Sequence, residues 1–265
     1  MIPDALQSEL DRLASLLLPE HQSGIYWLDT AELPTDRVLD RCWGFTGRHA
    51  DVSCREAIGD RWTGRKPCVA LALDRIERAL REGDAYFSPE LLTLALTGYV
   101  TGVAIHEVGH IADDGFDTRP ITDGLATYAD ASHEFSVNYY AADLDFASGK
   151  PPWYLHGPHW LRVVTHAAHR AQVAGFQFPD ASVWVRDNNV CPLLHTARAT
   201  CFDELTTLAQ VPLSDLIVYR PSDDYAGLWR CKTSRWRSTR PADDHDADRH
   251  VQSALSYFPA KDITQ

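Results

Sequence analysis

The sequence predicts an α+β fold in which a small sheet flanks one long, buried helix and a mostly helical C-terminal part follows. The run that begins at Ser88 is apolar on almost every side up to the HEVGH segment at residues 106–110, which indicates a helix surrounded by protein. Short apolar segments with the length of strands precede it, at residues 24–29 and 69–73. With 45% apolar and 23% charged residues over 265 positions, the composition is that of a globular protein with a sizeable core.

The charge and the N-terminal segment bear on partners and location. The formal net charge is −12, and so acidic a surface repels phosphate backbones, which argues against nucleic acid as the main partner. The N-terminal segment lacks the basic region and the continuous apolar stretch of a signal peptide. The longest uncharged run, residues 91–105, is shorter than the roughly 20 residues that a membrane span needs. We therefore expect a cytoplasmic protein without a membrane partner.

The first third of the chain is expected to form short elements. An amphipathic pattern predicts a helix over residues 3–18, and GIYWLD at residues 24–29 is typical of a strand. Residues 42–67 are rich in Gly, Arg and polar side chains, which favours loops and short irregular strands. The apolar run at residues 69–73 fits either a strand or the start of the helix expected over residues 74–81.

The central helix has a clear start signal in Ser88, Pro89 and Glu90. Serine caps the first backbone donors, proline is tolerated in the first turn, and glutamate complements the positive end of the helix dipole. The helix is expected to end between Asp113 and Gly115, because glycine can adopt the left-handed conformation that closes a helix.

The remaining elements are mostly helical. A loop is expected over residues 117–123 and a second helix over residues 125–147. A third helix is expected over residues 158–174, between two glycines. A short strand at residues 182–186 and a helix at residues 199–209 complete the prediction.

The HEVGH run, His106 to His110, is the HExxH pattern of zinc enzymes. Residues i and i+4 share one helical face, so His106 and His110 can present their imidazoles to one ion. Glu107 lies beside them and can take a proton from a zinc-bound water, whose pKa the metal lowers. Gly109 inside the motif lets a neighbouring backbone approach closely.

A catalytic zinc site needs a third protein ligand. Asp113 and Phe116 stand where the metzincin pattern needs a glycine and a ligand, which excludes that class. The gluzincin arrangement places a glutamate on the next helix, and Glu134 is the only glutamate between Glu107 and Glu204. Glu134 is therefore the best candidate for the third ligand. The rival ligands are Asp113, Asp114 and Asp117.

The segment from Glu134 to Leu144 resembles the E-x-x-A-N-x-F-A-A-x-L helix of the ImmA/IrrE-type metallopeptidases. The matching positions are Glu134, Asn138, Ala141, Ala142 and Leu144, with Val137 for the usual Ala and Tyr140 for the usual Phe. The resemblance extends from His106 to Leu144, about 40 residues. Members of that family are intracellular gluzincin-like enzymes, some of which cleave repressors.

This resemblance implies a zincin-like fold with Glu134 as a zinc ligand. It also suggests Asn138 as the partner that holds a zinc-bound histidine by its other ring nitrogen. The edge strand of the sheet would then bind an extended peptide beside the zinc. The C-terminal part matches no family that we can name, so a repressor-cleaving role does not transfer to this chain.

The third helix carries four polar residues whose spacings of 3, 4 and 3 place them on one face: His159, Arg162, His166 and His169. Burying such a face without partners would be costly, so we expect a shared polar pocket that faces the zinc. One of its groups would stabilise the oxyanion of the tetrahedral intermediate, and the alternative is a solvated face near a partner surface. The leading candidates are Arg162 and His166, followed by His159 and Tyr140; His169 completes the face.

The residues together predict a zinc-dependent metallopeptidase, a hydrolase of peptides or proteins. His106, His110 and Glu134 hold Zn²⁺, and Glu107 is the general base. Two alternatives remain: a zinc-binding regulatory module without turnover, and a zinc hydrolase of a non-peptide amide. We expect one continuous globule in three regions: an N-terminal α/β part, a catalytic core and a C-terminal α/β extension, at residues 1–87, 88–175 and 176–265.

The six cysteines are widely spaced and form no CxxC pair, which favours buried, reduced thiols in the cytosol. A structural metal site is the alternative, and it would draw on Cys42, Cys54 and Cys68.

Overall fold

The computed structural model describes residues 1–33, 43–47, 55, 57–83, 88–118, 158–183, 191–219 and 221–225. The helices are α1 (Asp4–Leu17), α3 (Leu73–Gly83), α4 (Pro89–Thr118), α6 (Pro158–Val173), α7 (Asp180–Val183), α8 (Cys191–Thr200) and α9 (Phe202–Thr207). The strands are β1 (Tyr26–Asp29), β2 (Gly44–Gly47) and β3 (Cys68–Leu71), and 3-10 turns lie at η1 (Thr30–Glu32), η3 (Gly59–Arg61) and η4 (Leu213–Val218). This combination of a small sheet with mostly helical structure is α+β.

The three strands form one mixed sheet in the order β1-β3-β2. Strand β1 is parallel to β3, whereas β2 is antiparallel to β3 and places Thr46 opposite Val69. Every residue of β1 and β3 is buried, so alternate side chains pack on both faces of the sheet. Trp27 and Val69 belong to the main core, while Tyr26 packs on the other face with Leu28 and its neighbours.

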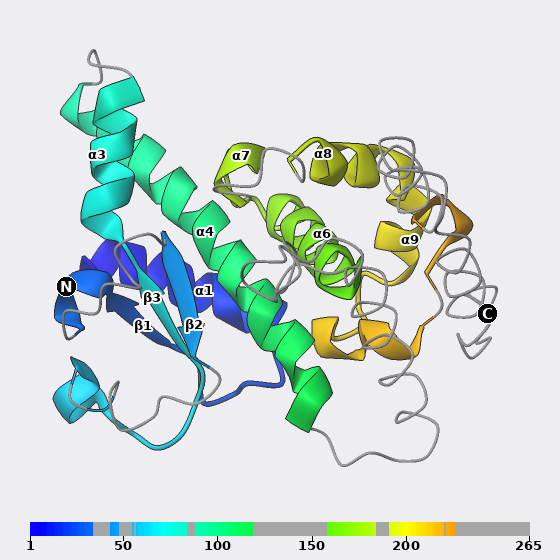
Figure 1. The fold of residues 1–265 in the computed structure, drawn as a ribbon, viewed down its shortest axis with the longest axis horizontal. Helices are drawn as coiled ribbons and strands as arrows, with labels where there is room; N and C mark the ends of the chain where they lie inside the picture. Colours follow the sequence, from blue (N-terminus) through cyan, green and yellow to red (C-terminus); the bar gives the residue numbers. More distant parts are fainter. Residues whose placement is uncertain are drawn as a thin grey trace, which may run out of the picture.

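Helix α4 runs diagonally across the molecule, with the sheet on one side and α6 and α7 on the other (Figure 1). Its middle part is mostly buried, as the apolar pattern predicts: Val100, Val103, Ala104, Ile105, Val108, Ile111 and Ala112 all lie in the core. Its first turns are exposed, with Leu91 at 54% and Leu94 at 67%. The helix continues to Thr118, three residues past the expected end, because a glycine inside a helix costs only about 1 kcal/mol.

The same helix is long and apolar enough to cross a membrane by length and composition alone. This apolar stretch extends from Pro89 to Asp113, longer than the uncharged run suggests, and 56% of its most apolar window is buried inside the protein. The buried share lies against the sheet, α6 and α7, which is the environment of a core helix.

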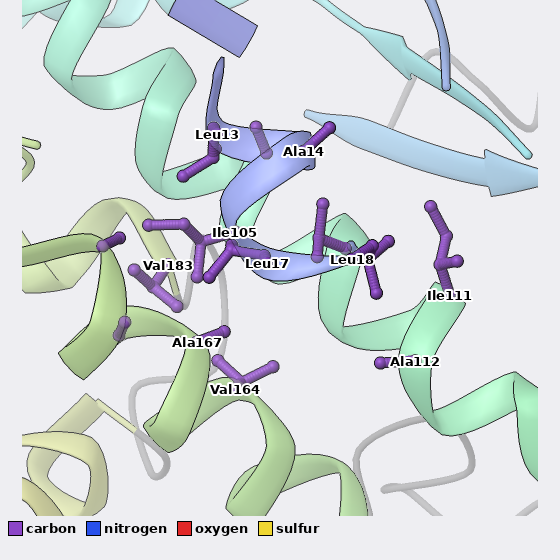
Figure 2. Packing of buried hydrophobic residues seen from close by; sticks show 14 of the residues in the cluster. Leu13, Ala14, Leu17, Leu18, Ile105, Ile111, Ala112, Val164, Ala167 and Val183 are labelled. Atoms are coloured by element: carbon purple, nitrogen blue, oxygen red, sulfur yellow. The ribbon is translucent and has the colours of Figure 1, made fainter. Parts of the chain in front are cut away.

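One hydrophobic cluster contains residues from all three expected regions. Figure 2 shows Leu13 and Leu17 of α1 beside Ile105 of α4, with Val164 of α6 and Val183 of α7 in the same cluster. Burial of each such side chain contributes roughly 1.5–3 kcal/mol to stability. The core therefore joins the N-terminal helix to the helices that surround α4.

Most of the expected elements are confirmed where the structure describes them. The helices expected over residues 3–18, 74–81 and 158–174 are α1, α3 and α6, and the ambiguous run at residues 69–73 is largely strand β3. The helix expected over residues 199–209 is instead two helices that meet at Cys201.

The strand expected over residues 182–186 is wrong in its described part, which is the end of α7. Pro179 precedes this helix, and its carbonyl accepts hydrogen bonds from both the backbone and the hydroxyl of Ser182. These local bonds favour a helical turn over a strand. The helix expected over residues 125–147 lies outside the described residues, as does most of the loop before it.

Two of the cysteines confirm the expectation of buried thiols. Cys68 and Cys201 are buried and reduced. Cys42 and Cys54 lie outside the described residues, and so does any metal site that would include them.

Candidate metal centre

The ring nitrogens of His106 and His110 converge on one face of α4. Their Nε2 atoms are 3.2 Å apart, and the two ring planes are inclined at 72°. The helix itself brings them together, because residues four apart lie one above the other on the same face. The sequence prediction that these two side chains point to one place is confirmed.

The separation of the two nitrogens fits two ligands of one zinc ion. A zinc–nitrogen bond is about 2.0–2.1 Å long, so two such bonds span 3.2 Å at an angle of roughly 100°. In the absence of metal the same separation suits one N–H···N hydrogen bond. The two Nε2 atoms can therefore share a proton when no metal is bound, and the same separation suits the binding of one cation by both.

The other ring nitrogen of His106 is held by the C-terminal part of the chain. Its Nδ1 lies 2.7 Å from the carbonyl oxygen of Val183, at the end of α7. A carbonyl only accepts hydrogen bonds, so Nδ1 carries the proton and Nε2 keeps its lone pair. Burial lowers the pKa of His106 to about 4, opposed by this hydrogen bond, so the ring is neutral at pH 7. A neutral imidazole held in this way is the form that binds a metal.

Trp160 of α6 forms a wall beside the two histidines. Its ring centroid lies 4.8 Å from that of His106 and 5.2 Å from that of His110, nearly parallel to the latter. Gly109 permits this approach: a Cβ there would lie 2.2 Å from Val164 Cγ2 and 3.2 Å from Trp160 Nε1. A close approach at Gly109 therefore occurs, but side chains of α6 make it and not the neighbouring backbone that was expected.

Glu107 faces strand β2, on the side of α4 that packs against the sheet. It is 5% exposed, and its Oε2 accepts a hydrogen bond of 2.5 Å from Thr46 Oγ1. A Cβ at Gly44 would lie 2.5 Å from Glu107 Oε1, so only glycine leaves room for this carboxyl. Burial raises the pKa of Glu107 to about 7, although the bond from Thr46 favours the carboxylate.

The described side chains include no third metal ligand. Within the described part of the chain, no group of three His, Cys, Asp or Glu side chains is arranged to hold a metal, so Asp113 does not complete the site. Glu134, Asn138 and Tyr140 lie outside the described residues, as do the side chains of Asp114, Asp117 and His159. Glu134 thus stays a prediction.

The expected role of Arg162 and His166 needs correction. They do share one buried polar pocket, but it lies on the side of α6 that faces α9 and η4. Arg162 Nε donates to Glu204 Oε1 at 2.6 Å, and His166 Nε2 lies 3.2 Å from the same oxygen. Trp160 and Val164 occupy the side of α6 that faces the metal centre. The physical reason is charge. A buried guanidinium needs a carboxylate, and Glu204 of α9 provides one on this side of α6.

Most polar groups of this second cluster have hydrogen-bond partners, although His166 Nδ1 has none among the described residues. Arg162 also donates to the carbonyls of Leu216 (2.8 Å) and Tyr219 (2.7 Å), and Ser222 N donates to Glu204 Oε2 at 2.6 Å. Burial alone would raise the pKa of Glu204, but these donors and the charge of Arg162 hold it well below its usual range. Burial lowers the pKa of His166 to about 4, so its contact with Glu204 is a hydrogen bond of a neutral ring.

His169, the last member of the polar face, is half-buried near Phe202. Its ring lies edge-on to that of Phe202, with centroids 5.9 Å apart. Burial lowers its pKa, helped by the charges of Arg198 and Arg170. His169 therefore lies outside both clusters.

Sequence reasoning missed three neighbours of the metal centre: Thr46, Trp160 and Val183. Thr46 lies in a segment without strong periodicity, and the role of Val183 depends on a backbone carbonyl that has no sequence signal. Trp160 adjoins the polar residues of its helix and could have been found by placing the apolar side of α6 against α4. The chain matches no protein-family model, and no match was found among curated proteins or solved structures.

Proposed function

We propose that this protein is a zinc-dependent metallopeptidase that hydrolyses peptide bonds in peptide or protein substrates. The observation that carries the proposal is the convergence of His106 Nε2 and His110 Nε2, 3.2 Å apart, on the helix that also carries the buried carboxyl of Glu107. Glu134 is proposed as the third ligand. In this proposal the α+β fold is zincin-like, with α4 as the active-site helix.

The position of strand β2 supports a peptide as the substrate. In the described sheet β2 is an edge strand, and its Thr46 contacts Glu107 directly. An extended peptide can add to the edge of a sheet through main-chain hydrogen bonds. A peptide bound along β2 would pass beside the carboxyl group that the reaction needs.

In the proposed mechanism the chain's own residues orient the metal and move the proton. A zinc ion bound by the histidines would supply Lewis-acid polarisation of the scissile carbonyl and of water. Glu107 accepts a proton from the attacking water as the new C–O bond forms. It then delivers that proton to the leaving nitrogen as the C–N bond breaks. A pKa raised to about 7 suits a group that must take and return a proton, and a nearby cation favours its carboxylate form.

Metal content tests the first half of the proposal. We expect the purified protein to hold about one zinc per chain by elemental analysis, and His106→Ala and Glu134→Ala to lose it. His169→Ala is the matched control, because this histidine lies outside the cluster and should not affect the metal. A wild-type protein that binds zinc no more tightly than the His106→Ala variant would end the proposal.

A peptide library tests the second half. The wild-type protein should cleave peptides, and Glu107→Gln should abolish turnover while it retains zinc, because the amide cannot accept the proton. Zinc binding without cleavage of any peptide would contradict the peptidase proposal. Cleavage of small amides in its place would identify the non-peptide alternative, and no turnover at all would identify the regulatory module.

A further inference from the structure

We infer that α7, and above all the main-chain carbonyl of Val183, positions His106 for metal binding. This inference rests on the proposed function and deepens it, because it assigns to the C-terminal part of the chain a role in the metal centre. Val183 is separated from His106 by 77 residues, and its oxygen lies 2.7 Å from Nδ1. It is a positioning residue, since it acts through the ring of His106.

The position of Val183 in α7 places this carbonyl beside His106. Val183 is the last described residue of α7, and its carbonyl oxygen lies within hydrogen-bond distance of the His106 ring. The side chain of Val183 is fully buried in the main core, so its backbone is held in place (Figure 2). An ion pair between Asp180 and Arg198 of α8 holds the start of the same helix.

Close packing against α4 brings α7 within reach of His106. Gly102 lies one turn before His106, and a Cβ there would lie 1.7 Å from Ser182 Oγ and 2.7 Å from Ser182 Cβ. Ser182 is itself fully buried, and its hydroxyl donates to Pro179 O. Any residue larger than glycine at position 102 would therefore push α7 away from α4.

The bond has a definite consequence for the metal centre. With Nδ1 as the donor, the lone pair of His106 lies on Nε2, the atom that faces His110. Without the carbonyl, the proton can move to Nε2, and the ring can rotate out of the ligand position. Fixing the tautomer by such a contact is expected to change metal affinity by roughly 10- to 100-fold.

The test compares two glycines on the same helix that face the same segment. In Gly102→Ala we expect zinc to bind about 10- to 100-fold more weakly in a chelator competition. Gly98→Ala is the matched control, because its Cβ would come no nearer than 3.3 Å to Gln177 O and leaves Ser182 untouched. It has the same gain in helix propensity, and its zinc affinity should equal that of the wild type.

A second substitution should restore the zinc affinity that Gly102→Ala lowers. Ser182→Gly deletes both side-chain atoms that the new Cβ would meet, leaving only the main-chain carbon of residue 182 at 3.2 Å. The double variant Gly102→Ala/Ser182→Gly should bind zinc more tightly than Gly102→Ala. Circular dichroism of each variant verifies that it is folded. A folded Gly102→Ala protein with wild-type zinc affinity would overturn the inference.

A measurement on the metal-free wild-type protein separates this inference from the proposed function. Long-range ¹H–¹⁵N spectra of the histidine rings should show His106 protonated at Nδ1 between pH 6 and 8, whether or not zinc binds later. Protonation at Nε2, or an average of the two forms, would refute the role of Val183 even if the enzyme binds zinc and cleaves peptides. Failure of the wild type to bind zinc would refute the proposed function and leave the spectra unchanged.

Discussion

Among the described residues, the buried polar cluster around Glu204 beside α6 and the group on α4 that contains Glu107, His106 and His110 differ in what completes them. Around Glu204 the partners are protein groups of opposite charge and matched donors, and the pKa of this carboxyl is held well below its usual range. Around Glu107 there is no guanidinium among the described contacts, and burial raises the pKa to about 7. On the same helix, the ring nitrogens of His106 and His110 converge. A cluster completed by protein charges stabilises a fold, whereas one whose lone pairs converge is suited to an external cation.

Matched substitutions at the two glutamates give the largest contrast in turnover. Glu107→Gln should lower kcat for peptide cleavage by about 10²–10⁴-fold, because the general base is lost. In metal-free protein at pH 8 it should leave the free energy of unfolding equal or higher, since burial opposes the ionised form of Glu107.

Glu204→Gln should do the opposite. It lies away from the candidate metal centre, so kcat for peptide cleavage should be retained, while the free energy of unfolding falls. Urea unfolding and peptide cleavage on both variants give the four values. A Glu204→Gln protein of unchanged stability would remove the distinction between a structural and a functional cluster.

The next effect concerns stability alone. Glu204→Ala removes the Glu204 carboxylate from the buried guanidinium of Arg162, which should cost about 3–5 kcal/mol in the free energy of unfolding. Replacing both residues, as in Arg162→Met/Glu204→Leu, should recover most of this loss, because no buried charge remains. The measurement is a double-mutant cycle by urea unfolding. Equal instability of the double and single variants would show that Arg162 has other partners that suffice.

The pH dependence of stability sharpens the same comparison. His166 has a folded pKa of about 4, below the unfolded value of about 6.5. Between these values the unfolded chain binds more protons, so stability present above pH 6.5 is lost as the pH falls towards 4. Glu204, also lowered, adds to the loss below about pH 4.3. His166→Gln should reduce the slope between pH 6.5 and 4 in urea unfolding of metal-free protein and leave the share of His106, whose pKa burial also lowers to about 4. An unchanged slope would contradict the assignment.

The smallest expected effect is at the edge strand. Thr46→Val removes the hydrogen bond to Glu107 without changing the shape of the side chain, and should lower kcat about tenfold, equivalent to about 1.4 kcal/mol. Thr46→Ser keeps the hydroxyl and should recover most of the rate. KM should change little in either variant if Thr46 acts through Glu107. Equal rates for the valine and serine variants would show that the hydroxyl has no part in catalysis.

The parts of the fold that are predictable from sequence are those with local causes. Ser88, Pro89 and Glu90 give the start of α4, and the amphipathic pattern gives α1, because capping and periodicity act within a few residues. The strand expected over residues 182–186 is wrong in its described part because of another local cause. The hydrogen bonds from Ser182 to Pro179 outweigh the apolar pattern that predicted a strand. The spacing of Arg162 and His166 correctly indicates a shared pocket but contains no information about its direction.

By itself the sequence determines that His106 and His110 share a face, since the pitch of a helix alone aligns residues i and i+4. Only the tertiary structure decides that Val183 holds one of these rings, that β2 covers Glu107, and that Arg162 turns towards Glu204. Each of those contacts joins residues at least 42 positions apart. Their formation depends on how the whole core packs, which no local pattern encodes.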